Sequence, residues 1–300
     1  MRISIIYNPR SGRGKALRLS EAITRITQAR GHKTTTHDIH AAGGVADETI
    51  HDCDRLVIVG GDGTVHHLLP QLAQTPDNPK PPFYHCGTGT ANLISHAFKM
   101  TSNPARLVNL LERDTPPVRV DLPLCNGHPF LIMTSLGMDA SVIHRFEESR
   151  KLGGYRAYIN PIMREIIKPR FAQAQVQLDN NPAPGFSKPG ILVIANMPNY
   201  GGHFNPCPNA RWNDATLDIA HIPGNYSLTS GLRYLALRAR IPASTTARAE
   251  QITITATNPS CVQIDGEKPT HVPSILAPDS TLNFTMSPQS ILVRAPLLNP

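Results

Sequence analysis

The first part of the chain alternates short apolar runs with stretches of helical spacing. Strands are expected at residues 2–7, 33–37 and 55–59. Helices are expected at residues 16–30, 46–52, 65–72 and 104–112. Strands that alternate with helices, with glycines where a strand ends, predict a parallel sheet covered by helices. The proline-rich residues 75–82 are expected to form a loop.

The second part has many short strands separated by turns. Alternation is cleanest at residues 171–178, where Ala174 and Val176 fall on one face and Gln175 and Gln177 on the other. Further strands are expected at residues 130–135, 191–195, 217–222, 251–256, 262–265, 281–286 and 290–294, with helices at 157–168 and 227–238. This pattern predicts an antiparallel sandwich or barrel.

The change of pattern predicts two domains, which also suits a chain of 300 residues. We expect an α/β, Rossmann-like domain with a parallel sheet at residues 1–118. An all-β domain, an antiparallel β-sandwich, is expected at residues 119–287. The last strand could return to either domain, so residues 288–300 are left open as a return to the first.

Composition narrows the classes of partner. Lys and Arg outnumber Asp and Glu by 29 to 22, which favours an anionic partner such as nucleotide phosphate, nucleic acid or an acidic membrane. No motif or aromatic platform supports nucleic-acid binding, and none is expected. The five cysteines contain no CxxC pair, so neither a disulfide framework nor a zinc site is expected.

The sequence also indicates where in the cell the protein is expected to act. The start of the chain enters a strand-like run with no signal-peptide pattern, and no run of 18 apolar residues occurs. We therefore expect a cytoplasmic protein that reaches any lipid from the aqueous side, with attachment to the inner membrane surface left open. Arginines follow a leucine stripe at residues 228–248. A core-facing stripe is the simpler interpretation, and contact with an anionic membrane is the alternative.

The string Gly60-Gly61-Asp62-Gly63-Thr64 carries the clearest chemistry. It follows a buried-type strand and precedes a helix, and such glycines let the backbone approach a phosphate. The Asp would repel phosphate unless Mg²⁺ lay between them. A dinucleotide fingerprint is excluded because its third Gly is missing, and no Walker P-loop spacing is present.

Two more small-residue loops follow strands or precede helices. Residues 8–15 combine turn residues with Ser11 and Lys15, which suits phosphate contact. Residues 87–92 form a third such turn, which contains Thr90 and Asn92. Three loops at one edge of a sheet would converge where α/β sheets bind ligands.

Taken in order, these loops resemble the diacylglycerol kinase catalytic family, which includes sphingosine and ceramide kinases. The resemblance covers nearly the whole chain. The matching strings are the NPxSG-type loop at 8–12, GGDGT at 60–64, GTAN at 89–92, Val120-Asp121-Leu122, Gly137-Met138-Asp139-Ala140, Gly154 with Ala157-Tyr158, Tyr200-Gly201-Gly202, Pro208-Asn209-Ala210, Leu217-Asp218 and Ile264-Asp265-Gly266-Glu267. NAD kinases and phosphofructokinases share GGDGT, whereas GTAN with a late DGE is more specific to lipid kinases.

The resemblance implies an ATP- and Mg²⁺-dependent transfer of the γ-phosphate to a lipid hydroxyl, above all diacylglycerol, in phospholipid biosynthesis. It implies that Glu267 is the general base, that Asp62 helps to hold catalytic Mg²⁺ and that Asp121 supports that network. A structural Mg²⁺ would lie on the Asp214 carboxylate and the carbonyls of Arg211 and Thr216. With the loop residues above, the expected ATP contacts are Asn8, Ser11, Lys15, Thr36, Gly60, Gly61, Asp62, Gly63, Thr64, His66, Thr90 and Asn92.

The carboxylates near residue 266 suit this chemistry on their own. If Gly266 keeps the chain extended, Asp265 and Glu267 point to one face, and paired carboxylates could raise one pKa and make a base. On these three residues alone, a plain β-turn with surface acids is the favoured interpretation.

The sequence departs from the family's pattern at four places. His66 and His67 follow GGDGT, His96 replaces a frequent Arg, and Ala215 replaces the Gly after Asp214. These changes leave open a catalytically weak nucleotide or lipid sensor. The motifs are also compatible with a sphingosine or other lipid-alcohol kinase and, less well, with a NAD kinase. A homodimer is left open.

Overall fold

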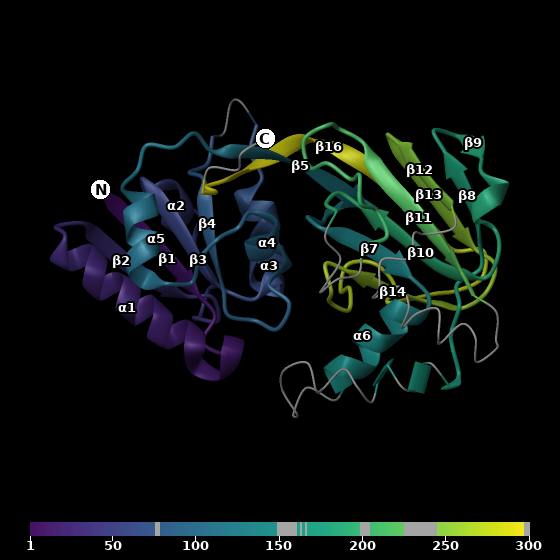
Figure 1. Ribbon diagram of the computed structural model, residues 1–300, viewed down its shortest axis with the longest axis horizontal. Helices are drawn as coiled ribbons and strands as arrows, with labels where there is room; N and C mark the ends of the chain where they lie inside the picture. Colours follow the sequence, from purple (N-terminus) through teal and green to yellow (C-terminus); the bar gives the residue numbers. More distant parts are fainter. Residues whose placement is uncertain are drawn as a thin grey trace. The chain divides into compact units, whose positions relative to one another are not determined.

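The computed structural model describes residues 1–75, 79–148, 161–162, 164–165, 167–198, 205–224 and 245–296 (Figure 1). The chain divides into two compact units. The first comprises Met1–Val120 with the end of the chain from Pro288, and the second is Asp121–Ser287. Two strands, β5 (Val118–Cys125) and β16 (Thr281–Val293), run from one unit into the other.

The first unit contains the expected parallel sheet. Its strands are β1 (Arg2–Tyr7), β2 (Lys33–Asp38), β3 (Arg55–Gly60) and β4 (Phe83–Gly87), in the order β2-β1-β3-β4. All three pairings between them are parallel. The end of β16 continues the sheet beside β4, where Val293 lies opposite Phe83. The sequence interpretation omitted β4, which begins directly after the proline-rich loop.

Helices cover this sheet. They are α1 (Lys15–Ala29), α2 (Asp47–His51), α3 (Asp62–Leu72), α4 (Leu93–Ala97) and α5 (Pro104–Leu111), with a 3-10 turn η1 (Ser11–Gly14) before α1. One core cluster packs Ile5, Val57 and Tyr84 of the strands against Ile23 of α1 and Leu107 of α5. Helix α3 begins three residues before the expected start, because Gly61 is still extended and Asp62 already opens the helix.

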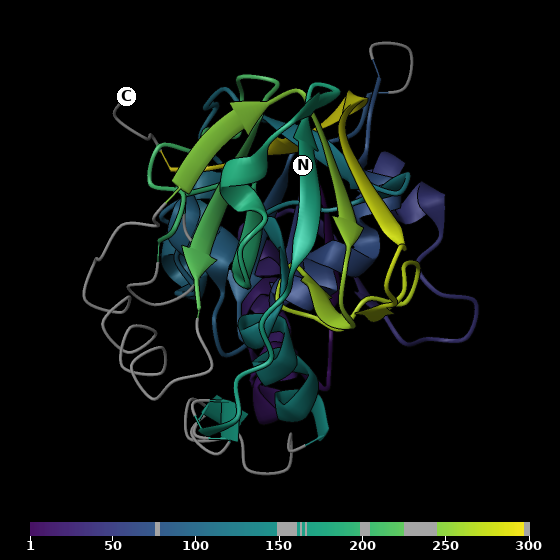
Figure 2. The ribbon, with the colours of Figure 1, turned by 90° about the vertical axis from the view of Figure 1, so that its right-hand side faces the viewer.

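The second unit is made of antiparallel strands. One layer has the order β16-β13-β8-β9, and the other has the order β12-β11-β10-β7-β14-β15 (Figure 2). The strands are β6 (His128–Pro129), β7 (Met133–Leu136), β8 (Ala174–Leu178), β9 (Asn181–Pro182), β10 (Gly190–Ala195), β11 (Leu217–Pro223), β12 (Thr245–Ala249), β13 (Gln251–Ala256), β14 (Ser260–Ile264) and β15 (Ile275–Leu276).

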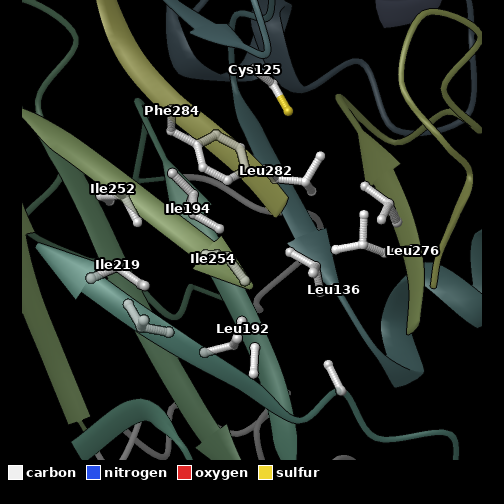
Figure 3. Packing of buried hydrophobic residues seen from close by; sticks show 14 of the residues in the cluster. Cys125, Leu136, Leu192, Ile194, Ile219, Ile252, Ile254, Leu276, Leu282 and Phe284 are labelled. Carbon is white, nitrogen blue, oxygen red and sulfur yellow. The ribbon is translucent and has the colours of Figure 1, made fainter. Parts of the chain in front are cut away.

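The two layers enclose one apolar core. Figure 3 shows Phe284 and Leu282 of β16 and Ile254 of β13 with Leu192 and Ile194 of β10, all fully or almost fully buried. Each fully buried side chain of this kind contributes about 1.5–3 kcal/mol relative to an exposed one. The predicted fold class, a parallel α/β unit followed by an antiparallel β-sandwich, is therefore confirmed.

Several element predictions need correction. The two strands expected at 281–286 and 290–294 are one strand, β16. The strand expected at 130–135 is displaced to β7, and helix α6 (Met138–Glu148) was not expected. The helix expected at 227–238 lies outside the described residues, as does most of that at 157–168, of which residues 161–162, 164–165 and 167 are helical. In the described part of the chain, no helix is both long enough and apolar enough to cross a bilayer.

Candidate active site

Three loops of the first unit come together where its parallel strands end. The Asn8 N–H donates to the carbonyl of Val59 (2.9 Å), and the Thr88 N–H donates to that of Gly60 (2.8 Å). The Thr88 hydroxyl also donates to the Ser11 hydroxyl at 2.9 Å. These bonds join the loops after β1, β3 and β4, so the predicted convergence at one sheet edge is confirmed.

The loops touch through their backbones as well. A Cβ atom on Gly89 would lie only 2.8 Å from the Cα of Gly61, a separation that real side chains do not adopt. The Asn8 side-chain nitrogen donates to the Thr64 hydroxyl at 3.2 Å, which links the first loop to the first turn of α3. Backbone of the loops is thus brought together at the start of a helix, which suits a phosphate group.

Asp62 joins the second loop to the third. Its carboxylate oxygens accept the backbone N–H groups of Leu93 (2.9 Å) and Ile94 (3.1 Å), so the side chain caps α4. Asn92 closes the same loop, since its side chain accepts the Gly89 N–H at 2.8 Å and donates to the Gly89 carbonyl at 3.0 Å. Asp62 therefore holds the loop in place, and an ionised carboxylate with two donors keeps lone pairs for a cation.

A fully buried histidine contacts the residues next to these loops from the protein interior. His85 lies on β4, with its ring 3.2 Å from the Gly60 carbonyl and 3.0 Å from the Ser95 hydroxyl. Burial lowers the pKa of His85, although the Asp62 carboxylate acts in the opposite direction. A neutral His85 therefore fixes the end of β3 without adding charge.

The remaining ATP-contact residues divide into two groups. Lys15 opens α1 and is exposed near Arg10, while Thr90 is half-buried in the third loop and His66 half-buried on α3. Thr36 does not join them. It lies on the edge strand β2 and lines a groove of about 450 Å³ with Tyr7 and residues of α1. Its contact with ATP stays a prediction.

The turn with the expected general base lies in the second unit. Asp265 (φ 51°) and Gly266 (φ 80°) are both left-handed, so Ile264 and Glu267 pair across a tight two-residue turn. The condition of an extended chain through Gly266 is therefore not met, and the alternative interpretation of a turn is correct as far as the backbone is concerned. Instead, the buried Asp265 carboxylate accepts the backbone N–H groups of residues 131, 132 and 133 at 2.8, 2.7 and 3.1 Å. These bonds anchor the turn, and Glu267 stands half-buried at its end.

Asp121 holds the loop that was expected to bind structural Mg²⁺. Its carboxylate accepts the Ala215 N–H at 2.8 Å, and its own N–H donates to the Trp212 carbonyl at 2.7 Å. Ala215 is left-handed (φ 56°), the conformation that the Gly usual at this position adopts without strain. The Asn196 side chain donates to the Asp121 carbonyl at 3.1 Å, so Asp121 is fixed from both sides.

Arg248 supplies a positive charge to the same loop. Its guanidinium pairs with Asp214, donates to the Thr216 hydroxyl at 2.5 Å and lies 3.5 Å from the Asp218 carboxylate. Thr216 also donates its hydroxyl to Asp214 at 2.9 Å. Burial raises the pKa of Asp218, and Arg248 opposes that shift. The Arg248 guanidinium already places a positive charge on Asp214, so this loop conformation does not fit a metal cation beside it.

The Asp62 and Asp214 carboxylates differ in how well they could bind Mg²⁺. Within the described ranges, no group of three or more His, Cys, Asp or Glu side chains is arranged to hold a metal. Mg²⁺ in phosphoryl-transfer sites uses one or two carboxylates together with substrate phosphates. Asp62 fits that role, whereas Asp214 is already paired with Arg248.

Several structural contributors carried no recognisable sequence signal. His85 and Arg248 belong to no motif, and each acts through a partner distant in sequence. Thr88 lies in the predicted 87–92 turn, but its bond to Ser11 had no signal of its own. Only the short apolar run around His85, formed by Phe83, Tyr84 and Cys86 and ending at Gly87, could have indicated a buried strand. The quoted strings at 154–158 and 200–202, and the arginines at 233, 238 and 240, lie outside the described residues.

Comparisons with known proteins agree with this geometry. A model of the diacylglycerol kinase catalytic domain matches residues 2–122, and a model of the YegS C-terminal NAD kinase beta sandwich-like domain matches residues 133–294. A probable lipid kinase YegS-like protein of Pseudomonas fluorescens is 29% identical over 256 residues, which cover 81% of this chain and 77% of that protein. A diacylglycerol kinase of Staphylococcus carnosus is 24% identical over 280 residues, covering 89% of this chain and 88% of the relative.

Solved structures support the fold. A diacylglycerol kinase from Bacillus anthracis superposes with a TM-score of 0.70 at 21% identity, covering 95% of this chain and 94% of that one. The family models together span both units, and the second alone matches more than half of the chain. The chain therefore belongs to the diacylglycerol kinase family of lipid kinases.

Proposed function

We propose that this enzyme transfers the γ-phosphate of ATP to the hydroxyl of diacylglycerol and so forms phosphatidic acid, a step of phospholipid biosynthesis. The observation that carries the proposal is the convergence of the three loops. Asn8 bonds to Thr64, Thr88 bonds to Ser11, and Asp62 accepts the backbone N–H of Leu93. Phosphoryl transfer depends mainly on positioning and on charge neutralisation, and this rigid backbone surface suits both.

The chain's own residues then act on ATP as follows. Backbone N–H groups at the start of α3 and at residues 90–91 are the proposed phosphate donors, and the exposed Arg10 and Lys15 supply positive charge. Asp62 is the carboxylate that would hold Mg²⁺ brought in with ATP. When bound, that ion would neutralise the negative charge that develops on the phosphates.

Glu267 is the proposed general base. The lipid hydroxyl oxygen forms a bond to the γ-phosphorus while the bond from that phosphorus to the oxygen shared with the β-phosphate breaks, and ADP leaves. The hydroxyl proton passes to the Glu267 carboxylate. The three hydrogen bonds to Asp265 support this role, because they hold the turn whose next side chain is Glu267.

The test is transfer of labelled γ-phosphate from Mg²⁺·ATP to a panel of lipids in mixed micelles, with NAD as a control acceptor. Labelled phosphatidic acid is the expected product. Labelled phosphate on sphingosine or another lipid alcohol would support lipid kinase activity but would show that diacylglycerol is not the substrate. Labelled NADP would replace the proposal with a NAD kinase. ATP binding without any product would favour a sensor and direct attention to His66, His67 and His96.

A further inference from the structure

A chain of buried polar groups lies between α6 and the β7–β14 pair of the second unit. It consists of Asp139 on α6, Ser135 on β7 and Gln263 on β14, followed by the backbone N–H of Gly266. Ser135 and Gln263 are completely buried, and Asp139 is only 3% exposed. Buried polar groups of this kind must satisfy one another, because no solvent replaces a lost partner.

The hydrogen bonds of this chain all run in one direction. The Gly266 N–H donates to Gln263 Oε1 at 2.7 Å, and Gln263 Nε2 donates to Ser135 Oγ at 2.7 Å. The Ser135 hydroxyl then donates to Asp139 Oδ2. The acceptor at the end of the chain is therefore the Asp139 carboxyl group.

This direction fixes the side-chain amide of Gln263. Ser135 has one hydroxyl hydrogen and gives it to Asp139, so its oxygen can only accept from the amide nitrogen. The amide oxygen must then face Gly266. A rotated amide would place its N–H₂ group against the Gly266 N–H, two donors with no acceptor between them.

We propose that Asp139 is a positioning residue for the phosphoryl transfer. Through Ser135 and Gln263, it sets the amide orientation that holds the Asp265-Gly266 turn and, with it, Glu267. The inference rests on the proposed function only for its effect on the reaction rate. The hydrogen bond from Gly266 to Gln263 can be tested without any activity.

The first test compares Asp139→Asn with Asp139→Leu. The Asn variant keeps an acceptor for Ser135, whereas the Leu variant removes it. We expect Asp139→Leu to increase hydrogen exchange at the Gly266 amide and to lower kcat by on the order of tenfold or more, with KM for ATP changed less than about twofold. Asp139→Asn should retain most of the protection and most of kcat. Equal effects of the two variants on Gly266 exchange would overturn the proposal.

A second test reverses the donor and acceptor roles in part of this series of hydrogen bonds. In the Gln263→Glu variant, the new carboxyl group still accepts the hydrogen bond from the Gly266 N–H. When this carboxyl group is ionised, however, it can no longer donate to Ser135. The single hydroxyl hydrogen of Ser135 then lies between two carboxylates and can satisfy only one of them. We expect a loss of kcat relative to wild type that is larger at pH 8 than at pH 6, since protonation of the new carboxyl restores the missing donor. The double variant Gln263→Glu with Asp139→Asn should recover activity at pH 8. Its new amide at position 139 can donate to the Ser135 oxygen, and the Ser135 hydroxyl can then donate to the carboxylate introduced at position 263.

Thr134→Val is the matched control, since it removes a neighbouring buried hydroxyl of β7 that has no partner among the described residues. It should leave Gly266 exchange and kcat unchanged. A double variant no more active than Gln263→Glu alone would overturn the proposal. If the wild type phosphorylated no lipid, the proposed function would fail, while Gly266 exchange in the Asp139 variants would still decide the positioning role.

Discussion

The carboxylate of Asp62 accepts a 2.9 Å hydrogen bond from the backbone N–H of Leu93, so the first turn of α3 caps the start of α4. The GGDGT and GTAN strings, about 30 residues apart in the sequence, are thereby one structural unit. An acid whose oxygens already have two N–H partners is held in its orientation before any ligand arrives. Asp62 thus combines a structural role with its proposed role toward Mg²⁺.

Asp62→Asn should damage both roles. The amide keeps one acceptor and turns an N–H₂ group toward a backbone N–H, so we expect a loss of about 1–3 kcal/mol in the free energy of unfolding. Lipid phosphorylation should fall by about 100-fold or more, because the charge opposite the metal is gone. Urea denaturation and initial rates measure the two effects. The exposed Asp52→Asn should change neither, and full activity in Asp62→Asn would contradict the metal role.

Glu267→Gln separates chemistry from binding. A general base acts on transfer and not on ATP affinity, so kcat should fall by roughly 10²–10⁴-fold. The dissociation constant for ATP, measured by calorimetry, should stay within about twofold. The exposed Glu250→Gln serves as a charge-matched control. A variant that retains wild-type kcat would remove Glu267 from the mechanism.

Arg248 predicts how the 211–216 loop responds to metal. Because the guanidinium already pairs with Asp214 and lies 3.5 Å from the Asp218 carboxylate, the melting temperature of the wild type should be the same in EDTA and in excess Mg²⁺. Arg248→Ala should lower the free energy of unfolding by about 1 kcal/mol, as expected for a partly exposed pair, and should make melting sensitive to Mg²⁺. A wild-type melting temperature that rises with Mg²⁺ would show that the cation implied by the family resemblance binds here.

Asp139 gives the protein a pH dependence of defined sign. Burial raises the pKa of Asp139 to about 7, although the hydrogen bond from Ser135 acts against that shift. Between about pH 4 and pH 7 the folded state keeps a proton that the unfolded state has lost, so this group lowers stability as the pH rises. Asp139→Asn removes the titration. Its stability relative to wild type should increase over this range by at most roughly 4 kcal/mol.

Urea denaturation of the wild type and Asp139→Asn at pH 4.5 and pH 7.5 measures this difference. The Thr134→Val variant controls for a general change in the core of the second unit. A stability difference between wild type and Asp139→Asn that is the same at both pH values would show that Asp139 ionises normally.

Local patterns in the sequence were enough to predict the parallel sheet and the meeting of its loops. Apolar strands that end in glycine specify their own geometry, and parallel strands bring their ends to one edge. Strand β4 was not predicted because His85 interrupts its apolar run. The burial of that His is compensated by its hydrogen bonds to Gly60 and Ser95. A polar residue with distant partners looks like a surface residue in the sequence.

The same limit applies to the second unit. The resemblance drew attention to Asp265 and Glu267, but the left-handed turn follows from anchoring at residues 131–133, which lie more than 130 residues earlier. The pairing of Arg248 with Asp214 likewise depends on the β11–β12 register, in which Asp218 lies opposite Arg248. No spacing rule within one segment encodes such contacts.

The most direct measurement is the initial rate of labelled phosphate transfer from Mg²⁺·ATP to diacylglycerol, for the wild type and Glu267→Gln in the same micelles. We expect labelled phosphatidic acid from the wild type and a rate at least about 100-fold lower from the variant, with ATP bound equally by both. Absence of labelled phosphatidic acid from a wild type that binds ATP, or equal rates from the two proteins, would contradict this expectation.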